Sequence, residues 1–460
     1  MNSKNSDDSL EKLDKHKSVT PLPIQTWLVI TFLGIAGQIA WAVENSWFNV
    51  FVYDEITEDP SPVAWMVAVS AVTATVTTIL IGALSDRTRS KMGKRKPYIL
   101  FGYILWGIIT ALYPMVELIQ KLSVAVFMVI LMDAIMTFFG STANDACFNA
   151  WITDITDHSN RGRVQGILMM TTLVANLIAI GASGFIIEKY GYFVFFYVLG
   201  GFVSIAGLIA GLQVKEPPQN YPMQKLLSDS APESPIPPKK PFWQDVIYAF
   251  RPSTIRKNPL LYILLACMAL INIGGQVSAP YLFVYLENYL EFSKGEVSII
   301  GGVVILIAAI VSVLYGLISH RVPRKWVLVL TILFNCLFSI VFMWLRKMIP
   351  IILMYAVVLS LQMMNSIALE SWIQDLYPAS DRGKFQGARM VAFVAIPMIF
   401  GPIIGNSVIK SYGIPSATQE NGFIPTPEIF LFGGIVGILA LIPAIIIMFY
   451  EKSLRNYPKS

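Results

Sequence analysis

Charged residues are scarce in this sequence: Asp, Glu, Lys and Arg make up 14% of its 460 residues, against about a quarter in soluble domains. Cysteine and histidine are rarer still, with three of each. Cys147, Cys267 and Cys336 all fall inside apolar runs, so no disulfide framework is implied. The histidines are too far apart for a zinc site. These shortages exclude a soluble enzyme, a disordered chain and a secreted disulfide-bonded domain.

Long hydrophobic runs are what the sequence has in abundance. Hydrophobic residues make up 55% of the chain, and a membrane-spanning helix needs about 20 apolar residues. Twelve runs of suitable length lie at 27–53, 63–84, 98–118, 123–152, 166–187, 192–212, 260–286, 297–318, 326–345, 350–373, 388–409 and 429–450. The sequence therefore predicts an all-α membrane protein with twelve transmembrane helices.

The polar segments divide the chain. Residues 1–26 are polar and lack the apolar core and cleavage site of a signal peptide, so we expect a cytoplasmic tail. Residues 213–258 are rich in Pro, Ser, Lys and Asp and cannot span a membrane, which predicts a cytoplasmic linker. This leaves two six-helix halves, at 27–212 and 259–450, and a second tail at 451–460.

The basic residues predict the orientation. Of the 34 Lys and Arg, 28 lie in the tails, the linker and the even-to-odd loops or at their helix ends. The other six lie in odd-to-even loops: Lys121, Lys189, Lys294, Arg346, Lys347 and Lys410. By the positive-inside rule both termini are cytoplasmic, in a multi-pass protein of the cell membrane. Because the basic residues lie in short segments between apolar runs, they do not indicate a nucleic-acid partner.

The two halves repeat each other. Residues 151–166 and 372–387 are identical at eight of sixteen positions, including the Trp-Ile-x-Asp at the start of each segment. Parallel six-helix repeats are the layout of a rocking transporter, with a solute site between the halves near the membrane midplane.

The loop from Gly82 to Pro97 reads GALSDRTRSKMGKRKP. It resembles the signature loop of the major facilitator superfamily, in the lengthened form of the glycoside-pentoside-hexuronide:cation symporters and the related sucrose-type carriers. The run from Gln38 to Ala42 is also similar to the first helix of sucrose-type carriers. The resemblance covers nearly the whole chain, and it implies that helices 1, 4, 7 and 10 line a central cavity.

Charged residues at the cytoplasmic helix ends are candidates for a gate. Asp86 can pair with loop arginines, or it can face the positive N-terminal end of a helix from the other half. The fourth-to-fifth and tenth-to-eleventh loops offer equivalent charges. The gating candidates are Asp86, Arg87, Asp154, Arg161, Asp375 and Arg382. The alternative is that the basic residues only set the topology.

Acidic residues inside helices are expensive in a membrane and so indicate function. The candidates are Glu44, Asp133, Asp145 and Glu370. Asp145 matches the position where the resemblance implies a fourth-helix aspartate that couples a cation. The two second-helix acids of the melibiose-type symporters are replaced by Thr78 and Ala74. A proton needs only one titratable carboxylate, so we expect proton coupling through Asp145, with Glu44 and Glu370 in reserve.

Polar residues concentrate on the four helices that would line the cavity. Amides and carboxylates suit sugar hydroxyls, and Trp41 can cover an apolar sugar face. The substrate-binding candidates are Gln38, Trp41, Glu44, Asn45, Asn144, Asn149, Asn272, Gln276, Asn365 and Glu370. The alternative for each amide is a hydrogen bond between helices.

The sequence thus predicts a monomeric secondary transporter that takes up a sugar or glycoside with a cation, by alternating access. It shows no catalytic triad, metal motif or nucleotide-binding loop, so we expect no enzyme activity, cofactor or metal. One alternative is an exporter or a lipid carrier of the same fold. The other is a membrane sensor that transports nothing.

Overall fold

A computed structural model describes residues 22–156, 160–216, 248–377, 382–419 and 421–455. Within these ranges the side chains of residues 320, 382–384, 386 and 450–455 are not described. Residues 1–21 of the predicted N-terminal tail, 217–247 of the predicted linker and 456–460 of the second tail lie outside the described residues.

The N-terminal half is built of helices alone in the part of the chain that the structure describes. Its elements are α2 (Ile24–Glu44), α3 (Trp47–Phe51), η1 (Val52–Ile56), α4 (Ser61–Arg87), α5 (Lys96–Leu112), η2 (Tyr113–Leu118), α6 (Leu122–Gly140), η3 (Ser141–Phe148), α7 (Asn149–Ile155) and α8 (Arg161–Gln213). Here η1 and η3 are π-helical, and η2 is a 3₁₀-helix. The η segments continue their neighbouring helices, so α2 to η1 is one span and α6 to α7 is another.

The C-terminal half adds one small hairpin to the same plan. Its elements are α11 (Pro252–Lys257), α12 (Pro259–Ser278), η4 (Ala279–Tyr281), α13 (Leu282–Val284), η5 (Tyr285–Tyr289), α14 (Lys294–Ile318), η6 (Ser319–Arg321), α15 (Arg324–Val341), η7 (Phe342–Trp344), α16 (Met348–Leu376), α17 (Arg382–Met390), η8 (Val391–Ala395), α18 (Ile396–Tyr412), β1 (Ile414–Pro415), β2 (Phe423–Ile424), α19 (Glu428–Ile438) and α20 (Leu441–Arg455). The two strands pair antiparallel.

Helix α8 crosses the membrane twice. The described residues contain eleven helices that are long and apolar enough to span, and α8 is the longest of them with 53 residues. A continuous helix of that length would extend about 80 Å, far more than the roughly 30 Å hydrocarbon core. Gly191, with φ 79° and ψ 172°, breaks α8 between the fifth and sixth predicted spans. The twelve-crossing prediction is therefore confirmed.

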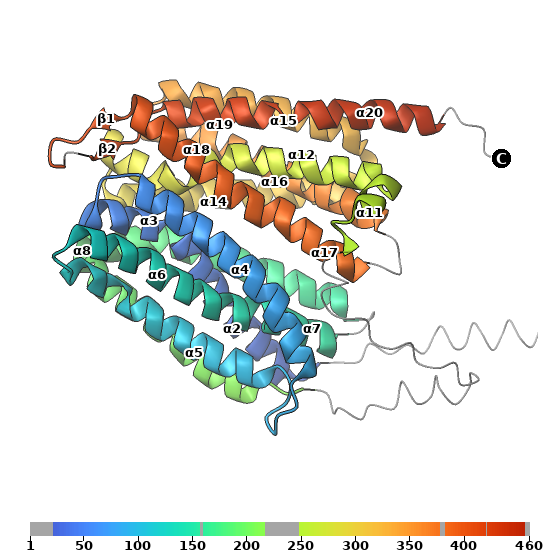
Figure 1. The fold of residues 1–460 in the computed structure, drawn as a ribbon, viewed down its shortest axis with the longest axis horizontal. Coiled ribbons are helices and arrows are strands. Elements are labelled where there is room, and N and C mark those ends of the chain that lie inside the picture. Colours follow the sequence, from blue (N-terminus) through green and yellow to red (C-terminus); the bar gives the residue numbers. More distant parts are fainter. Residues whose placement is uncertain (1–21, 157–159, 217–247, 378–381, 420, 456–460) are drawn as a thin grey trace, which may run out of the picture.

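The helices form two layers that correspond to the two halves (Figure 1). Elements α2 to α8 make one layer, and α12 to α20 make the other. The β1–β2 hairpin lies at one end of the molecule and the C-terminus at the other. We call these the hairpin end and the tail end; the charge distribution predicts that they are extracellular and cytoplasmic, respectively.

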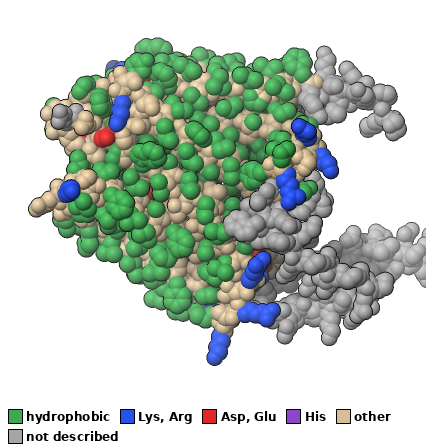
Figure 2. All heavy atoms as spheres, in the orientation of Figure 1, with side chains coloured by type: hydrophobic (Ala, Val, Ile, Leu, Met, Phe, Trp, Pro, Cys, Tyr) green, Lys and Arg blue, Asp and Glu red, His purple; other side chains and the backbone are tan. Residues whose placement is uncertain are grey.

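The flank between the two ends is apolar. Figure 2 shows hydrophobic side chains over most of this face, with Lys and Arg near the ends. Hydrophobic side chains such as Leu208, Val313 and Leu317 are exposed on the molecule, which suits contact with lipid.

Small residues bring helices close together inside each half. A Cβ on Gly207 of α8 would lie 2.4 Å from the Tyr103 Cβ of α5, and one on Gly405 of α18 would lie 2.3 Å from the Val277 carbonyl oxygen of α12. Such contacts allow backbones to pack at short range without large side chains between them. The glycine spacings at 207–211 and 401–405 therefore serve packing.

Candidate functional site

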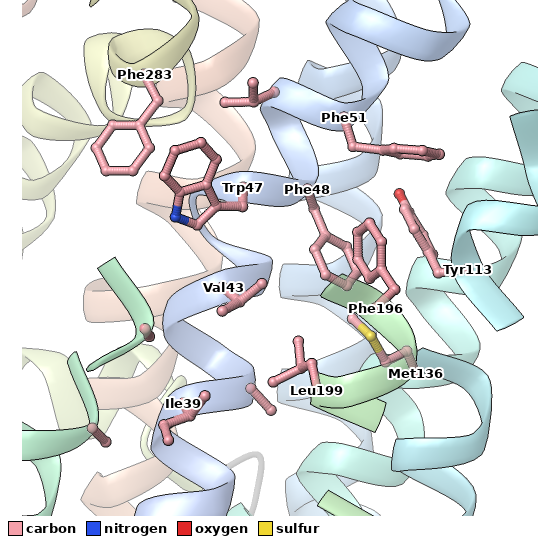
Figure 3. Close-up of a cluster of buried hydrophobic side chains, with 14 of the residues drawn as sticks. Ile39, Val43, Trp47, Phe48, Phe51, Tyr113, Met136, Phe196, Leu199 and Phe283 are labelled. Carbon is pink, nitrogen blue, oxygen red and sulfur yellow. The ribbon is translucent and has the colours of Figure 1, made fainter. Parts of the chain in front are cut away.

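The two halves touch at the hairpin end. The Tyr281 hydroxyl donates to the Pro60 carbonyl oxygen at 3.2 Å, and Lys294 Nζ lies 2.7 Å from Asp54 Oδ2. Trp47 packs on Phe283 with 5.2 Å between ring centroids, which Figure 3 shows beside the N-terminal aromatic cluster. These contacts join buried aromatic surface and opposite charges across the halves, so this end is closed.

The hairpin between α18 and α19 reaches over to the N-terminal half. Gln419 Oε1 accepts hydrogen bonds from the Thr57 hydroxyl at 2.9 Å and from the Glu58 backbone N–H at 3.0 Å. Lys410 Nζ lies 3.2 Å from Asp59 Oδ1. The hairpin thus connects the loop between the first and second spans to the C-terminal half.

The tail end is organised differently, because the ion pairs described there join residues of the same half. Arg95 at the start of α5 binds Asp86 of α4 through Nη2 at 2.8 Å and Asp154 of α7 through Nε at 2.6 Å. Glu216 accepts hydrogen bonds from the backbone N–H groups of Lys94, Arg95 and Lys96. Asp86 and Asp154 therefore hold α4, α5 and α7 together, and Asp86 has a loop arginine as its partner.

The other gating candidates do not gather at one point. Asp375 pairs with Arg324 within the C-terminal half, Nη1 to Oδ2 at 2.5 Å. Arg87 and Arg161 are exposed. The side chain of Arg382 lies outside the described residues.

Between the two ends, α2, η3 and the start of α7 carry the N-terminal candidates. Asn45 and Asn149 are exposed, and Gln38 and Trp41 are half-buried. Helices α2 and α7 make at most sparse contact with α12 and α16 among the described residues. A polar side chain that is exposed at membrane depth must face a water-filled space, so these positions are open to the region between the halves.

Asn144 links three spans and orients Asp145. Its Nδ2 donates to Asp145 Oδ1 at 3.0 Å, while its Oδ1 accepts from the Tyr103 hydroxyl of α5 at 2.9 Å. Tyr103 also reaches the Leu33 carbonyl oxygen of α2 at 3.0 Å. Asn144 is buried and Asp145 is half-buried. Asn144 therefore acts as a positioning residue, while Asp145 presents a carboxylate next to Asn149.

Glu44 lies in a chain of buried polar groups. The Thr137 hydroxyl of α6 is 3.0 Å from Glu44 Oε1 and 3.1 Å from the Ser70 hydroxyl of α4. The Ser70 hydroxyl is in hydrogen-bond contact with Asp133 Oδ2. Glu44 is 8% exposed and Asp133 1% exposed, so these two carboxylates are enclosed inside the N-terminal half.

The C-terminal candidates line a cavity within their own half, between α12, α15, α16 and α19. The amides that line it are the candidates Asn272, Gln276 and Asn365, together with Gln362 and Asn335. All of its lining residues belong to the C-terminal half, and none is charged. A neutral lining of amides offers donors and acceptors together.

Glu370 does not line this cavity and is paired with a cationic side chain. Its carboxylate accepts a hydrogen bond from Arg389 at the end of α17. Arg389 also lies over the Phe393 ring, 5.5 Å from its centroid. The pair joins α16 to α17, so the Glu370 charge is balanced within the C-terminal half.

Ser70, Thr137, Asn335 and Gln362 are site residues that are not among the candidates predicted from the sequence. A signal for Thr137 was present, because it follows the candidate Asp133 by four residues and so lies on the same helix face. Ser70 stands in an ordinary apolar run, and nothing in its local sequence distinguishes it.

A family model described as Major Facilitator Superfamily matches residues 26–289 and 264–460. The chain belongs to the Major Facilitator Superfamily. It is therefore a multi-pass membrane transporter, and the predicted major facilitator fold is confirmed.

Solved structures agree with this fold. A structure of the nucleoside transporter NupG matches with a TM-score of 0.66 and 14% identity, covering 94% of this chain and 99% of that one. A D-xylose-proton symporter matches with a TM-score of 0.65 and 14% identity, covering 91% and 97%. A bacterial homolog of the lysosomal transporter Spinster, in an inward-facing and unoccupied conformation, has a TM-score of 0.62 and 16% identity, covering 93% and 96%. At these identities the likeness shows the fold alone.

Among curated proteins, the anhydromuropeptide permease of Escherichia coli (strain K12) is 26% identical over 183 residues. The match covers 40% of this chain and 34% of the permease, so the chain spans about a third of the length of the curated relatives it matches.

Proposed function

We propose that this superfamily member is a secondary active transporter that takes up a sugar or glycoside together with a proton. The two bodies that rock against each other are residues 27–212 and 259–450, and each monomer carries its own pathway. The D-xylose-proton symporter of the same fold and the anhydromuropeptide permease support transport of a sugar-like solute.

One observation carries the proposal: the two halves hold complementary chemistry. The uncharged lining of the C-terminal cavity includes several amides, among them Asn272, Gln276 and Asn365. The N-terminal half carries Asp145 beside the exposed Asn149. Sugar hydroxyls both donate and accept, which suits amides, while a proton needs a carboxylate. The C-terminal amides would hold the solute, and Asp145 would take the coupling proton.

Asp145→Asn tests the coupling role. Asparagine mimics the protonated carboxyl group, so the variant should lose accumulation against a gradient and keep solute exchange. The assay compares proton-driven uptake into vesicles with counterflow, using a sugar chosen by thermal shift from a panel. Glu117→Gln, which removes an exposed carboxylate at the hairpin end, is the control and should accumulate normally. Full accumulation by Asp145→Asn would refute the coupling role of Asp145. Uptake that depends on the sodium gradient instead of pH would refute the assignment of the proton as the coupling ion.

We also propose that the chain lies in the cell membrane with both termini in the cytoplasm, because 28 of the 34 basic residues fall on that side. Single cysteines at the exposed Ala417 of the hairpin end and Ser90 of the tail end test this. An impermeant maleimide should label Ala417→Cys in intact cells, and Ser90→Cys only after permeabilisation. Labelling of Ser90→Cys in intact cells would reverse the orientation.

A further inference from the structure

The chain of buried polar groups that ends at Glu44 indicates a role separate from that of Asp145. It runs from Asp133 through the hydroxyls of Ser70 and Thr137 to Glu44. The outer oxygens Glu44 Oε2 and Asp133 Oδ1 are buried and have no hydrogen-bond partner. The groups come from three spans, α2, α4 and α6, so the chain exists only in the packed half.

The hydrogen bonds of this chain need one more hydrogen than its two hydroxyl groups supply. The chain has three oxygen-to-oxygen contacts, and each needs one hydrogen. Ser70 and Thr137 supply one hydrogen each, because a hydroxyl is a single donor. Two ionised carboxylates supply none. With both ionised, one contact would bring two oxygen lone pairs together, so the third hydrogen must be a proton on Asp133 or Glu44.

Charge leads to the same result. Among the ion pairs of the described residues, none involves Glu44 or Asp133. The other titratable groups that act on the pair are Asp145 and Tyr113, and α8 and α18, which pack on α2 and α4, bring no cation within ion-pair distance in the described part of the chain. Two bare carboxylates enclosed without a cation are costly, and uptake of a proton removes one of the charges.

We propose that Glu44 and Asp133 form an occluded site for one proton, which the hydroxyls of Ser70 and Thr137 relay between them. With the proton on Asp133, each group donates to the next and the charge rests on Glu44. In a concerted shift the Asp133 proton moves to the Ser70 oxygen, the Ser70 hydrogen moves to the Thr137 oxygen, and the Thr137 hydrogen moves to Glu44. The Asp133 O–H bond is broken and an O–H bond is formed on Glu44. The number of hydrogens is unchanged, and one negative charge moves from Glu44 to Asp133.

The site lies on the hairpin-end side of Asp145. Asp133 precedes Asp145 by twelve residues on the same span, which is about 18 Å along a helix. The hairpin end is closed in this structure, so the site holds its proton on the closed side while Asp145 faces the open region. The Glu44–Asp133 site would be a second proton-binding site beside Asp145 in the proposed proton-coupled transport. Its role in transport therefore rests on that proposed function. Its test requires no solute.

Infrared difference spectroscopy of the purified full chain in detergent tests the site at neutral pH. The wild type should show the carbonyl stretch of one buried protonated carboxyl group. Asp133→Asn and Glu44→Gln should each abolish that band and bind about one proton fewer, because the amide N–H supplies the third hydrogen permanently. A band that survives both variants, or that disappears only in Asp145→Asn, would overturn the proposal.

The hydroxyl relay has its own matched pair. Thr137→Val removes the bridge and should shift the band, while Thr137→Ser keeps the hydroxyl and should leave it unchanged. This pair decides the matter if the carboxylate variants do not fold, and an unshifted band in Thr137→Val would refute the relay. Exchange of choline for sodium at constant pH should have no effect. Loss of the band in sodium would show that the site takes that ion instead.

Discussion

At the scale of single residues, the partner of a charge decides what it does. Glu370 and Asp145 both stand on spans that were expected to line the cavity, but Glu370 binds Arg389, whereas the described partner of the Asp145 side chain is the amide of Asn144. Glu370 is thus part of the packing between α16 and α17. Asp145 keeps a carboxylate available for protonation.

Glu370→Gln should therefore destabilise the protein by about 1–3 kcal/mol, because it leaves the partly buried Arg389 guanidinium without its counter-charge. Thermal unfolding in detergent measures this. The double variant Glu370→Gln, Arg389→Gln should recover part of the loss, since it removes both members of the pair. The exposed Glu117→Gln should unfold like the wild type. Equal stability of Glu370→Gln and wild type would show that the pair contributes nothing.

At the scale of elements, one residue separates two spans. Gly191 has a φ of 79°, and a Cβ there would meet nothing within 4 Å. Any cost of adding a side chain is therefore a cost of backbone conformation alone. Gly201 on the same helix is equally open but has an ordinary helical φ, which makes it a matched control.

Gly191→Ala should lower the free energy of unfolding by about 1–3 kcal/mol, because this region of φ and ψ is almost restricted to glycine. Gly201→Ala should be neutral or slightly stabilising, since alanine favours helix. Both are measured by thermal unfolding of the purified protein. If the two variants unfold alike, the break in α8 does not depend on glycine.

At the scale of the whole molecule, the cross-half contacts at the hairpin end favour one conformation. Lys294 of the C-terminal half lies between Asp54 of the N-terminal half and Glu287 of its own half. It is the basic member of a cluster that closes this end, while the described ion pairs at the tail end stay within each half. With the predicted orientation, the closed end is the extracellular one.

Lys294→Gln should shift the population towards states open at the hairpin end, with a coupling energy of about 1–3 kcal/mol. Spin labels on the exposed Lys121 and Ala417 report that end, and labels on Ser90 and Ser253 report the tail end. The first distance should lengthen and the second shorten. Lys189→Gln removes the same charge from an exposed position at the hairpin end and should change neither. Unchanged distances in Lys294→Gln would remove its closing role.

The sequence by itself determined the class of the protein and the order of its spans. Hydrophobic runs long enough to cross a bilayer are a local property, and so are a polar linker and an internal repeat. Even the point at which α8 breaks lies in the gap between two predicted spans, 166–187 and 192–212. These features need no knowledge of which helix packs on which, because the membrane imposes length and hydrophobicity on each span separately.

Only the tertiary structure decided the partners. Ser70 and Thr137 lie 67 residues apart and meet because α4 packs on α6. Packing of α12 against α16 and α19 likewise places the C-terminal amides around one cavity inside their half. Hydrogen bonds act over about 3 Å, so they depend on how helices that are distant in sequence are rotated and packed. Local composition indicates that a polar residue must be satisfied, whereas the fold alone determines which group satisfies it.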